Sequence, residues 1–113
     1  MTTIWHNPRC SKSRQALALL EERGAEITIR RYLDEPPTLT ELQDAQSKLG
    51  LPAIEMIRTG EAAFKEMGLS KSDPDETLLK AMAKAPKLIE RPVIFSDDKA
   101  VIARPPEKSL DIL

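Results

Sequence analysis

The chain has 113 residues, of which 41% are hydrophobic and 31% are charged, and its formal net charge is −1. This length is enough for one hydrophobic core and too short for two, so we expect a single domain over residues 1–113. The balanced charge gives no bulk electrostatic reason to bind nucleic acid or an acidic membrane surface.

Cysteine content and hydropathy indicate the compartment. No apolar run is long enough to span a bilayer, and no basic segment followed by an apolar stretch precedes Trp5, so we expect a cytoplasmic protein. The single cysteine cannot form an internal disulfide, which agrees with a reducing compartment.

The first third of the chain predicts a strand, a helix and a second strand. Thr2 to Trp5 is typical of a short strand, and Ser13 to Arg23 has helical spacing of apolar residues before Gly24. Hydrophobic and polar residues then alternate from Ile27 to Arg31. Because this is about the length of one crossover unit, the two strands are expected to pair in parallel.

The middle of the chain predicts helices. Thr38-Leu39-Thr40-Glu41 is a capping-box pattern, and it opens a helix that Gly50 ends. A short helix is expected from Glu61 to Met67. A further helix, with Asp73 as its N-cap, is expected to end before Pro86.

The last third returns to strands and defines the fold class. Val93-Ile94-Phe95 and Ala100-Val101-Ile102-Ala103 predict a hairpin joined by Ser96-Asp97-Asp98-Lys99, followed by a closing helix. This order predicts an α/β protein with a thioredoxin-like mixed sheet and an all-helical insertion after the second strand. Arg91-Pro92 then takes the place where such folds keep a cis proline facing the cysteine loop, although a trans bond is the more common state of an X-Pro bond.

The one cysteine and the one histidine lie together in the loop between the first strand and the first helix. A thiol at a helix start has free N–H groups beside it, and Arg9, Lys12 and Arg14 add positive charge, so Cys10 is a candidate nucleophile. A buried, inert cysteine is the alternative, but its polar neighbours argue against that role. His6 either influences the ionisation of Cys10 or orders the loop as a structural group.

Several motifs together resemble the glutaredoxin-dependent arsenate reductase family, and the similarity runs from Ile4 to Leu113. The nucleophile loop is similar to that family's H-N-P-x-C-x-x-S-R pattern. The other matching segments are Tyr32-Leu33 with Pro36-Pro37-Thr38, Leu88-Ile89-Glu90-Arg91-Pro92, Arg104-Pro105 and Leu110-Asp111-Ile112-Leu113.

The resemblance implies roles for named residues. Cys10 is the implied nucleophile, His6 influences its ionisation, and three arginines bind the oxyanion. The implied oxyanion ligands are Arg58, Arg91 and Arg104, and the supporting loop residues are Asn7, Ser13, Arg14 and Pro92. A planar guanidinium fork suits a tetrahedral oxyanion, although any one of these arginines taken alone is more often a surface charge. No metal is expected, because one histidine and one cysteine are too few for zinc.

The resemblance also implies the partners: arsenate, glutathione as co-substrate, and glutaredoxin, with no bound cofactor. Stoichiometry gives a separate reason. Reduction of arsenate to arsenite takes two electrons, which thiols supply by joining two sulfurs. Because Ser13 stands where a C-x-x-C motif has its second cysteine, the second thiol must come from another molecule.

Three alternatives are weighed against this function. Transcription adaptors of the same fold family bind RNA polymerase and sense oxidation, but they typically carry C-x-x-C in this loop. A general thiol oxidoreductase that acts on glutathione mixed disulfides or on another oxyanion remains open. Phosphatase-like reductases with a C-x5-R anion loop fit poorly, because Arg14 follows Cys10 at a shorter spacing.

Overall fold

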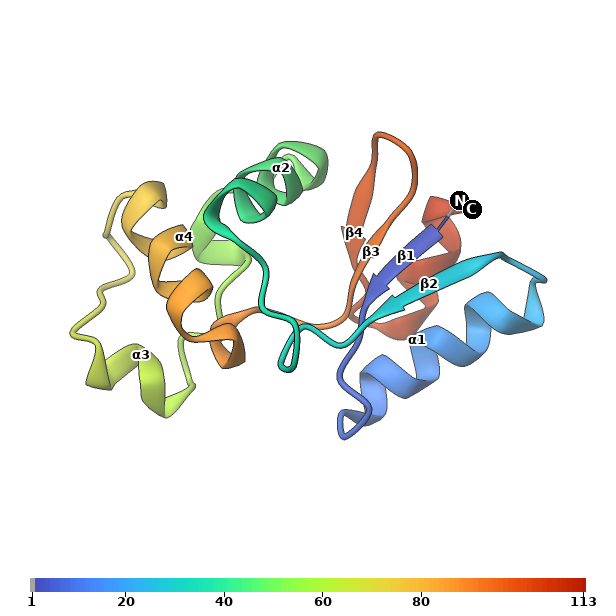
Figure 1. Cartoon of the computed structure of the whole chain (residues 1–113), viewed down its shortest axis with the longest axis horizontal. Coiled ribbons are helices and arrows are strands. Elements are labelled where there is room, and N and C mark those ends of the chain that lie inside the picture. Colours follow the sequence, from blue (N-terminus) through green and yellow to red (C-terminus); the bar gives the residue numbers. More distant parts are fainter. Residues whose placement is uncertain (1) are drawn as a thin grey trace. The chain divides into compact units, whose positions relative to one another are not determined.

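The computed structural model describes residues 2–113, and the contacts among them divide into two units (Figure 1). One unit joins the residues up to Glu35 with Arg91–Leu113, and the other comprises Pro36–Glu90. All the strands belong to the first unit, and the second is helical. The single domain expected from chain length stays a prediction, which the cooperativity of unfolding can test.

The first unit is built on a four-stranded mixed sheet, as predicted. Its strands are β1 (Thr2–Trp5), β2 (Ile27–Arg30), β3 (Val93–Phe95) and β4 (Ala100–Ile102), in the order β2-β1-β3-β4. β1 pairs in parallel with β2, whereas β1 with β3 and β3 with β4 are antiparallel. The parallel pair requires a crossover connection, and helix α1 (Ser11–Glu22) provides it.

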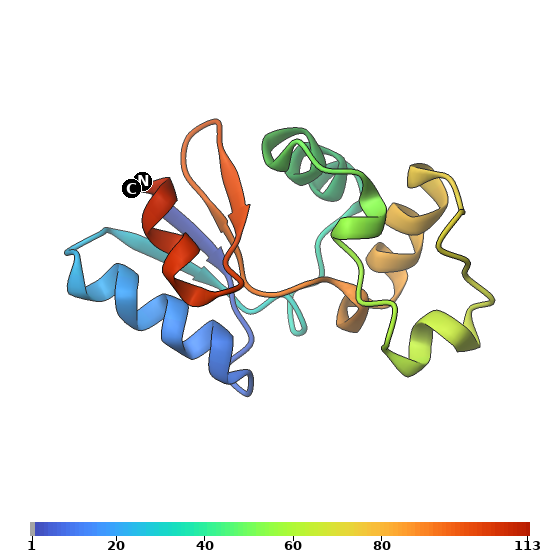
Figure 2. The same cartoon turned by 180° about the vertical axis from the view of Figure 1, so that it is seen from behind.

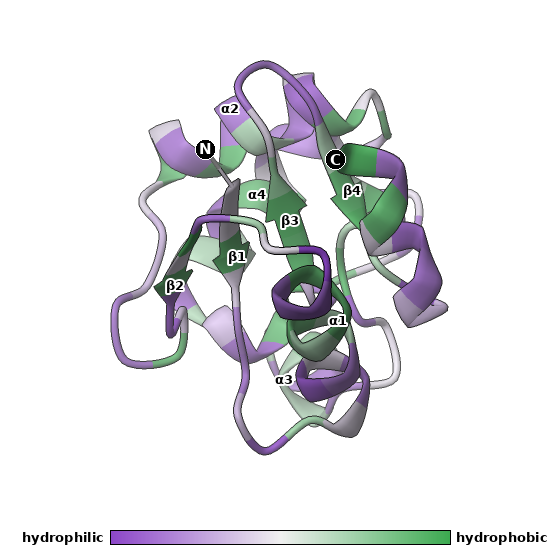
Figure 3. Cartoon of the chain, turned by 90° about the vertical axis from the view of Figure 1, so that its right-hand side faces the viewer, coloured by the Kyte–Doolittle hydropathy of each residue, from purple (hydrophilic) through white to green (hydrophobic). Residues whose placement is uncertain are grey.

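One face of this sheet is covered by α1 and by a C-terminal 3₁₀ helix (Pro106–Ile112), which lie side by side in Figure 2. Hydropathy explains why α1 packs on the sheet. Figure 3 shows that β3 and β4 are largely hydrophobic, while α1 alternates between hydrophilic and hydrophobic residues. The apolar positions of α1 therefore face the sheet. The buried residues of this core are Ile4, Ala16, Leu20, Ile94, Ala103 and Ile112.

The second unit consists of short helices. These are α2 (Leu39–Leu49), α3 (Ala62–Glu66) and α4 (Asp75–Lys84), with 3₁₀ turns at Ala53–Glu55 and Pro86–Leu88. Its fully buried side chains include Leu42, Leu78, Met82 and Leu88. An isolated antiparallel bridge joins Ile57, near the middle of this unit, to Ile89 at its end.

Helix α2 begins and ends as the sequence predicts. The Thr38 hydroxyl accepts a hydrogen bond from the Glu41 N–H at 3.1 Å, and the Glu41 carboxylate accepts one from the Thr38 N–H at 3.0 Å. Gly50 closes the helix in the left-handed conformation, with φ of 66°, which glycine adopts without steric cost.

Two predicted helix starts were wrong by one or two residues. α1 begins at Ser11 rather than Ser13, because Cys10 is its N-cap. α4 begins at Asp75 with Pro74 as N-cap, and the Asp73 carboxylate instead accepts a hydrogen bond from the Ser70 N–H at 2.9 Å. Asp73 therefore stabilises the preceding turn instead of the helix.

Over residues 2–113, none of the helices has the length and apolar character needed to cross a membrane.

Candidate active site

Cys10 lies at the junction between the loop that follows β1 and helix α1. As N-cap it has an extended backbone, with φ of −92° and ψ of 121°, and its carbonyl accepts from the Arg14 N–H at 3.0 Å. Its own N–H donates to the Asn7 carbonyl at 3.0 Å, which closes the loop. Cys10 is 8% exposed, so the thiol is largely enclosed.

The surroundings of Cys10 favour the thiolate. Burial raises the pKa of Cys10, but hydrogen bonding from the Ser13 N–H, the guanidinium and charge of Arg91, and the Lys12 N–H together outweigh it and lower the pKa below its usual value. The thiol forms no capping hydrogen bond of regular geometry, so the N–H groups at the start of α1 are left to stabilise the sulfur charge.

The source of the positive charge differs from the sequence-based expectation. Arg9, Lys12 and Arg14 flank Cys10 in sequence, yet the side chain that acts on the sulfur is that of Arg91, from the segment before β3. The Lys12 contribution comes from its backbone N–H. Arg9, Lys12 and Arg14 are exposed. Arg91 instead lies two residues before β3, and the pairing of β3 with β1 brings it to the sulfur.

His6 reaches Cys10 through Ser13. Its Nδ1 lies 2.6 Å from the fully buried Ser13 hydroxyl, which also accepts from the Asn7 N–H at 3.1 Å. Burial, with the charges of Arg31 and Arg14, lowers the pKa of His6 and keeps the ring neutral near pH 7. We therefore assign the Ser13 hydroxyl as donor to Nδ1, which leaves the ring proton on Nε2.

Two of the candidate oxyanion ligands lie together at the open end of the β3–β4 hairpin. The Arg104 guanidinium donates to the Arg91 carbonyl at 3.3 Å. Each of these arginines precedes a cis proline, Pro92 and Pro105, and the Pro92 carbonyl accepts from the Ala103 N–H at 3.0 Å. The Arg91-Pro92 bond is cis, as the fold class implies.

The remaining predicted residues divide between the two units. Arg14 donates to the Pro8 carbonyl at 2.8 Å, so it holds the nucleophile loop closed. Arg58 belongs to the helical unit, where its guanidinium donates to the Glu61 carboxylate at 2.9 Å. The first unit therefore brings together Cys10, His6, Asn7, Ser13, Arg14, Arg91, Pro92 and Arg104.

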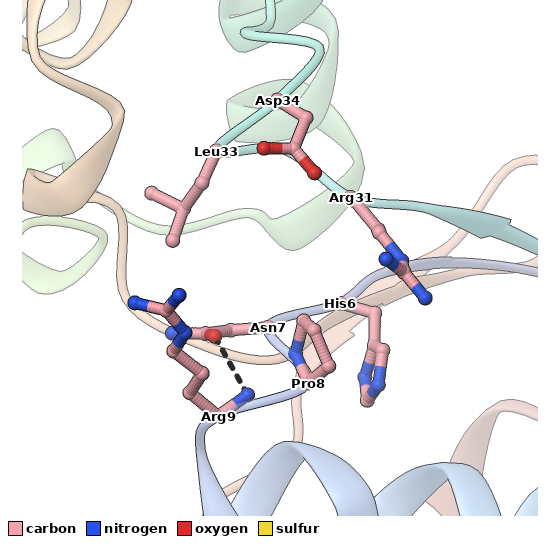
Figure 4. A pocket seen from close by; sticks show the side chains of 7 residues that line it. All are labelled: His6, Asn7, Pro8, Arg9, Arg31, Leu33 and Asp34. Atoms are coloured by element: carbon pink, nitrogen blue, oxygen red, sulfur yellow. Dashed lines mark hydrogen bonds between the residues drawn. The ribbon is translucent and has the colours of Figure 1, made fainter.

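Sequence reasoning missed a pocket beside the nucleophile loop (Figure 4). It lies between the loop that follows β1 and the turn that follows β2, and Arg31 and Asp34 line it from that turn. A signal was available, because adjacent parallel strands end at the same sheet edge and the residues after them share that edge. Over residues 2–113 no three histidine, cysteine or acidic side chains group as metal ligands would.

Three features define a thioredoxin-like protein: the strand order of the sheet, Cys10 at the start of the first helix, and the cis proline Pro92. Arg91, which precedes Pro92, acts on the Cys10 sulfur. A family model described as the ArsC family matches residues 5–112. The chain belongs to the ArsC family.

Relatives and solved structures agree with this membership. An arsenate reductase of Neisseria meningitidis is 49% identical over 106 residues, covering 92% of this chain and 91% of that protein. An arsenate reductase of Haemophilus influenzae is 44% identical over 97% of both chains. The structure of an arsenate reductase from Vibrio cholerae superposes with a TM-score of 0.94 at 43% identity, covering 99% of this chain and 97% of that one.

Proposed function

We propose that the protein reduces arsenate to arsenite, with Cys10 as its single nucleophile, glutathione as the source of the second thiol, and glutaredoxin as the partner that regenerates Cys10. The observation that carries the proposal is the stabilised sulfur of Cys10: the Ser13 N–H and the Arg91 guanidinium both act on it. Similarity to proteins named arsenate reductase, at 44–49% identity, supports arsenate as the substrate.

The proposed reaction begins with attack of the Cys10 thiolate on arsenic. A sulfur–arsenic bond forms, one arsenic–oxygen bond breaks, and the oxygen leaves as water after taking up protons. Arg91 and Arg104 are suited to balance the charge of the oxyanion, because guanidinium groups match tetrahedral oxyanions in shape and charge. The lowered pKa of Cys10 raises the fraction of thiolate, which is the form that attacks arsenic.

The second step transfers electrons to arsenic. The glutathione thiolate attacks the Cys10 sulfur, a disulfide forms, and the electron pair of the sulfur–arsenic bond stays on arsenic, which leaves as arsenite. Two thiols and arsenate thus give one disulfide, arsenite and water. A glutaredoxin thiolate then attacks the glutathione sulfur of the mixed disulfide and frees Cys10. Because the chain has one cysteine, no internal thiol can replace glutathione.

In this proposal His6 and Ser13 are positioning residues. The His6 ring fixes the Ser13 hydroxyl at 2.6 Å, and Ser13 in turn presents its N–H to the sulfur. Arg14 holds the loop through the Pro8 carbonyl. Arg58 is proposed as a third oxyanion ligand on the resemblance alone, and its pairing with Glu61 would have to break for it to bind substrate.

The experiment that tests the function follows NADPH oxidation by the purified protein with arsenate, glutathione, glutaredoxin and glutathione reductase. Each component is omitted in turn, and thioredoxin with its reductase replaces the glutathione system in one arm. We expect turnover that needs arsenate, glutathione, glutaredoxin and Cys10. Turnover with thioredoxin alone would keep the substrate and refute the proposed partners. Reduction of a glutathione mixed disulfide without any action on arsenate would refute the substrate.

A further inference from the structure

A pocket of ≈ 300 Å³ lies at the carboxyl ends of the two parallel strands β1 and β2. β1 and β2 run in parallel, and the pairing extends one step further where the His6 N–H donates to the Arg30 carbonyl at 2.8 Å. The segments that follow β1 and β2 separate beyond this point. Ligands of open α/β sheets bind at the carboxyl ends of parallel strands. The lining residues are His6, Asn7, Pro8, Arg9, Arg31, Leu33 and Asp34.

Both walls of this pocket are held by hydrogen bonds. In the first wall, the Asn7 side-chain carbonyl accepts from the Arg9 N–H at 3.0 Å (dashed in Figure 4). In the second wall, the Arg31 carbonyl accepts from the N–H groups of Asp34 at 3.0 Å and Glu35 at 2.9 Å. The pocket is therefore formed in advance of any ligand, which lowers the entropic cost of binding.

The charges in the pocket have a definite pattern. Arg9 and Arg31 lie on opposite sides of it in Figure 4, and the Asp34 carboxylate lies across from the nucleophile loop. Within residues 2–113, none of these three side chains forms an ion pair with another protein group. Two cations and one anion thus face a small cavity, and their charge is available to a ligand.

This pattern matches a small peptide with two carboxylates and one ammonium. Guanidinium groups bind carboxylates with charge-assisted, often bidentate, hydrogen bonds, and a carboxylate such as that of Asp34 accepts them from an ammonium group. Glutathione carries a γ-glutamyl carboxylate, a glycine carboxylate and one ammonium group. Asp34 also argues against arsenate as the occupant, because it would repel a small oxyanion at close range.

We propose that this pocket is the glutathione subsite, in which Arg9 and Arg31 bind the two carboxylates and Asp34 binds the ammonium group. The inference rests on the proposed function, because that function supplies the need for an external thiol. The four residues that precede Cys10 form one wall of the pocket, so a bound tripeptide is held next to the nucleophile loop. Pro8 and Leu33 give the apolar contacts that the peptide stem requires.

S-methylglutathione tests the subsite, because it keeps all three charged groups and cannot form a disulfide. Its binding to the wild-type protein is measured by calorimetry and amide NMR shifts, and compared with Arg31→Gln and Asp34→Asn. We expect about tenfold weaker binding for each variant, as for loss of one charge-assisted hydrogen bond. Arg23→Gln is the matched control, since it removes the same charge from the exposed end of α1.

Esterified ligand identifies which carboxylate meets Arg31. S-methylglutathione esterified at glycine lacks one carboxylate, so it should bind the wild type more weakly and show a smaller loss on Arg31→Gln if that carboxylate is the partner. An unchanged loss assigns Arg31 to the γ-glutamyl carboxylate. Equal affinity of wild type, Arg31→Gln and Asp34→Asn for S-methylglutathione, or no binding to the wild type, would overturn the subsite.

Kinetics separate this inference from the proposed function. In the arsenate assay, Arg31→Gln should raise the KM for glutathione about tenfold and leave the KM for arsenate unchanged. Active protein whose glutathione KM is insensitive to Arg31→Gln and Asp34→Asn refutes the subsite alone. Protein that binds S-methylglutathione in the pocket but leaves arsenate unreduced supports the subsite and refutes the function.

Discussion

Helices α1 and α2 have N-cap residues with the same backbone conformation, but the backbone N–H groups beside the two N-caps have different partners. α1 begins after Cys10 and α2 after Thr38, and both N-caps have an extended backbone. At α2 the Thr38 hydroxyl and the Glu41 carboxylate satisfy backbone donors in a complete capping box. At α1 the corresponding donor, the Ser13 N–H, acts on the sulfur of Cys10 instead.

Position 10 therefore serves the chemistry of the sulfur, and position 38 serves the stability of its helix. A hydroxyl or carboxylate is a good N-cap because it accepts strong hydrogen bonds, and sulfur is a weak acceptor until it is ionised. The N–H groups at the start of α1 therefore act most strongly on a thiolate. The same backbone geometry thus stabilises one helix and tunes a pKa at the other.

The largest expected effect is on activity. Cys10→Ser should abolish arsenate reduction, because serine is a poor nucleophile at neutral pH and the chain has no other thiol. Thr38→Ala should reduce arsenate at the wild-type rate. The coupled NADPH assay measures both variants, and a folded but inactive Thr38→Ala protein would contradict a purely stabilising role for Thr38.

The next effect concerns the charge beside Cys10. Arg91→Gln should raise the thiol pKa and lower kcat/KM for arsenate by roughly 10²–10³-fold, as for loss of one donor to a developing charge. Thiolate absorbance measured against pH follows the first change. Arg104→Gln is the control, since Arg104 contacts the Arg91 carbonyl and should leave the thiol pKa closer to that of the wild type.

Core substitutions in the two units test whether they unfold together. Leu20 and Leu78 are both fully buried, one in each unit, and replacing either with alanine should cost about 2–5 kcal/mol. The one tryptophan, Trp5, reports on the sheet unit, and circular dichroism reports on all helices. For the predicted single domain, Leu78→Ala shifts the Trp5 fluorescence midpoint as far as the dichroism midpoint. An unshifted fluorescence midpoint would mean that the units unfold separately.

A smaller effect should appear in stability at the two helix starts. Thr38→Ala should destabilise the protein by about 1 kcal/mol, through loss of the capping box. Cys10→Ser should instead stabilise it by about 0.5 kcal/mol at a pH at which the Cys10 thiol is protonated, because serine caps better than a neutral thiol. Urea unfolding measures both changes, and destabilisation by Cys10→Ser under these conditions would contradict the interpretation of position 10.

The smallest effect is the pH dependence of stability. The folded-state pKa of Cys10 lies below that of the unfolded thiol, so the unfolded state binds more protons between the two values. The free energy of unfolding should therefore rise with pH across this window, and the gain should be lost as the pH falls through the folded pKa. Cys10→Ser should lack this rise and Thr38→Ala should keep it. Urea titrations between pH 6 and 9 compare them.

Much of the fold could be predicted because local chemistry determines it. The sequence placed β1 at its observed residues, and the Thr38–Glu41 capping box and Gly50 set both ends of α2. The start of α1 was missed because no oxygen-bearing cap marks it.

The candidate site was harder to predict, because its contacts are long-range. His6, Cys10 and Ser13 lie in one loop and were evident as a cluster, but the action of Arg91 on the sulfur depends on the pairing of β1 with β3. Arg31 looked like the last residue of a strand, and only the parallel register brings it to the pocket beside the loop. The residue types in the loop indicate the chemistry, whereas the strand pairing of the sheet determines that Arg91 and Arg31 lie near the loop.

Ser13 limits how this enzyme framework could be altered. Its side chain is fully buried, it lies 2.6 Å from the His6 ring, and it also accepts the Asn7 N–H. A cysteine at this position would recreate the C-x-x-C motif, but its larger sulfur would crowd the ring and its thiol would weaken both hydrogen bonds. Engineering a self-sufficient dithiol from this scaffold therefore requires a change at His6 as well, and a single substitution at Ser13 does not provide it.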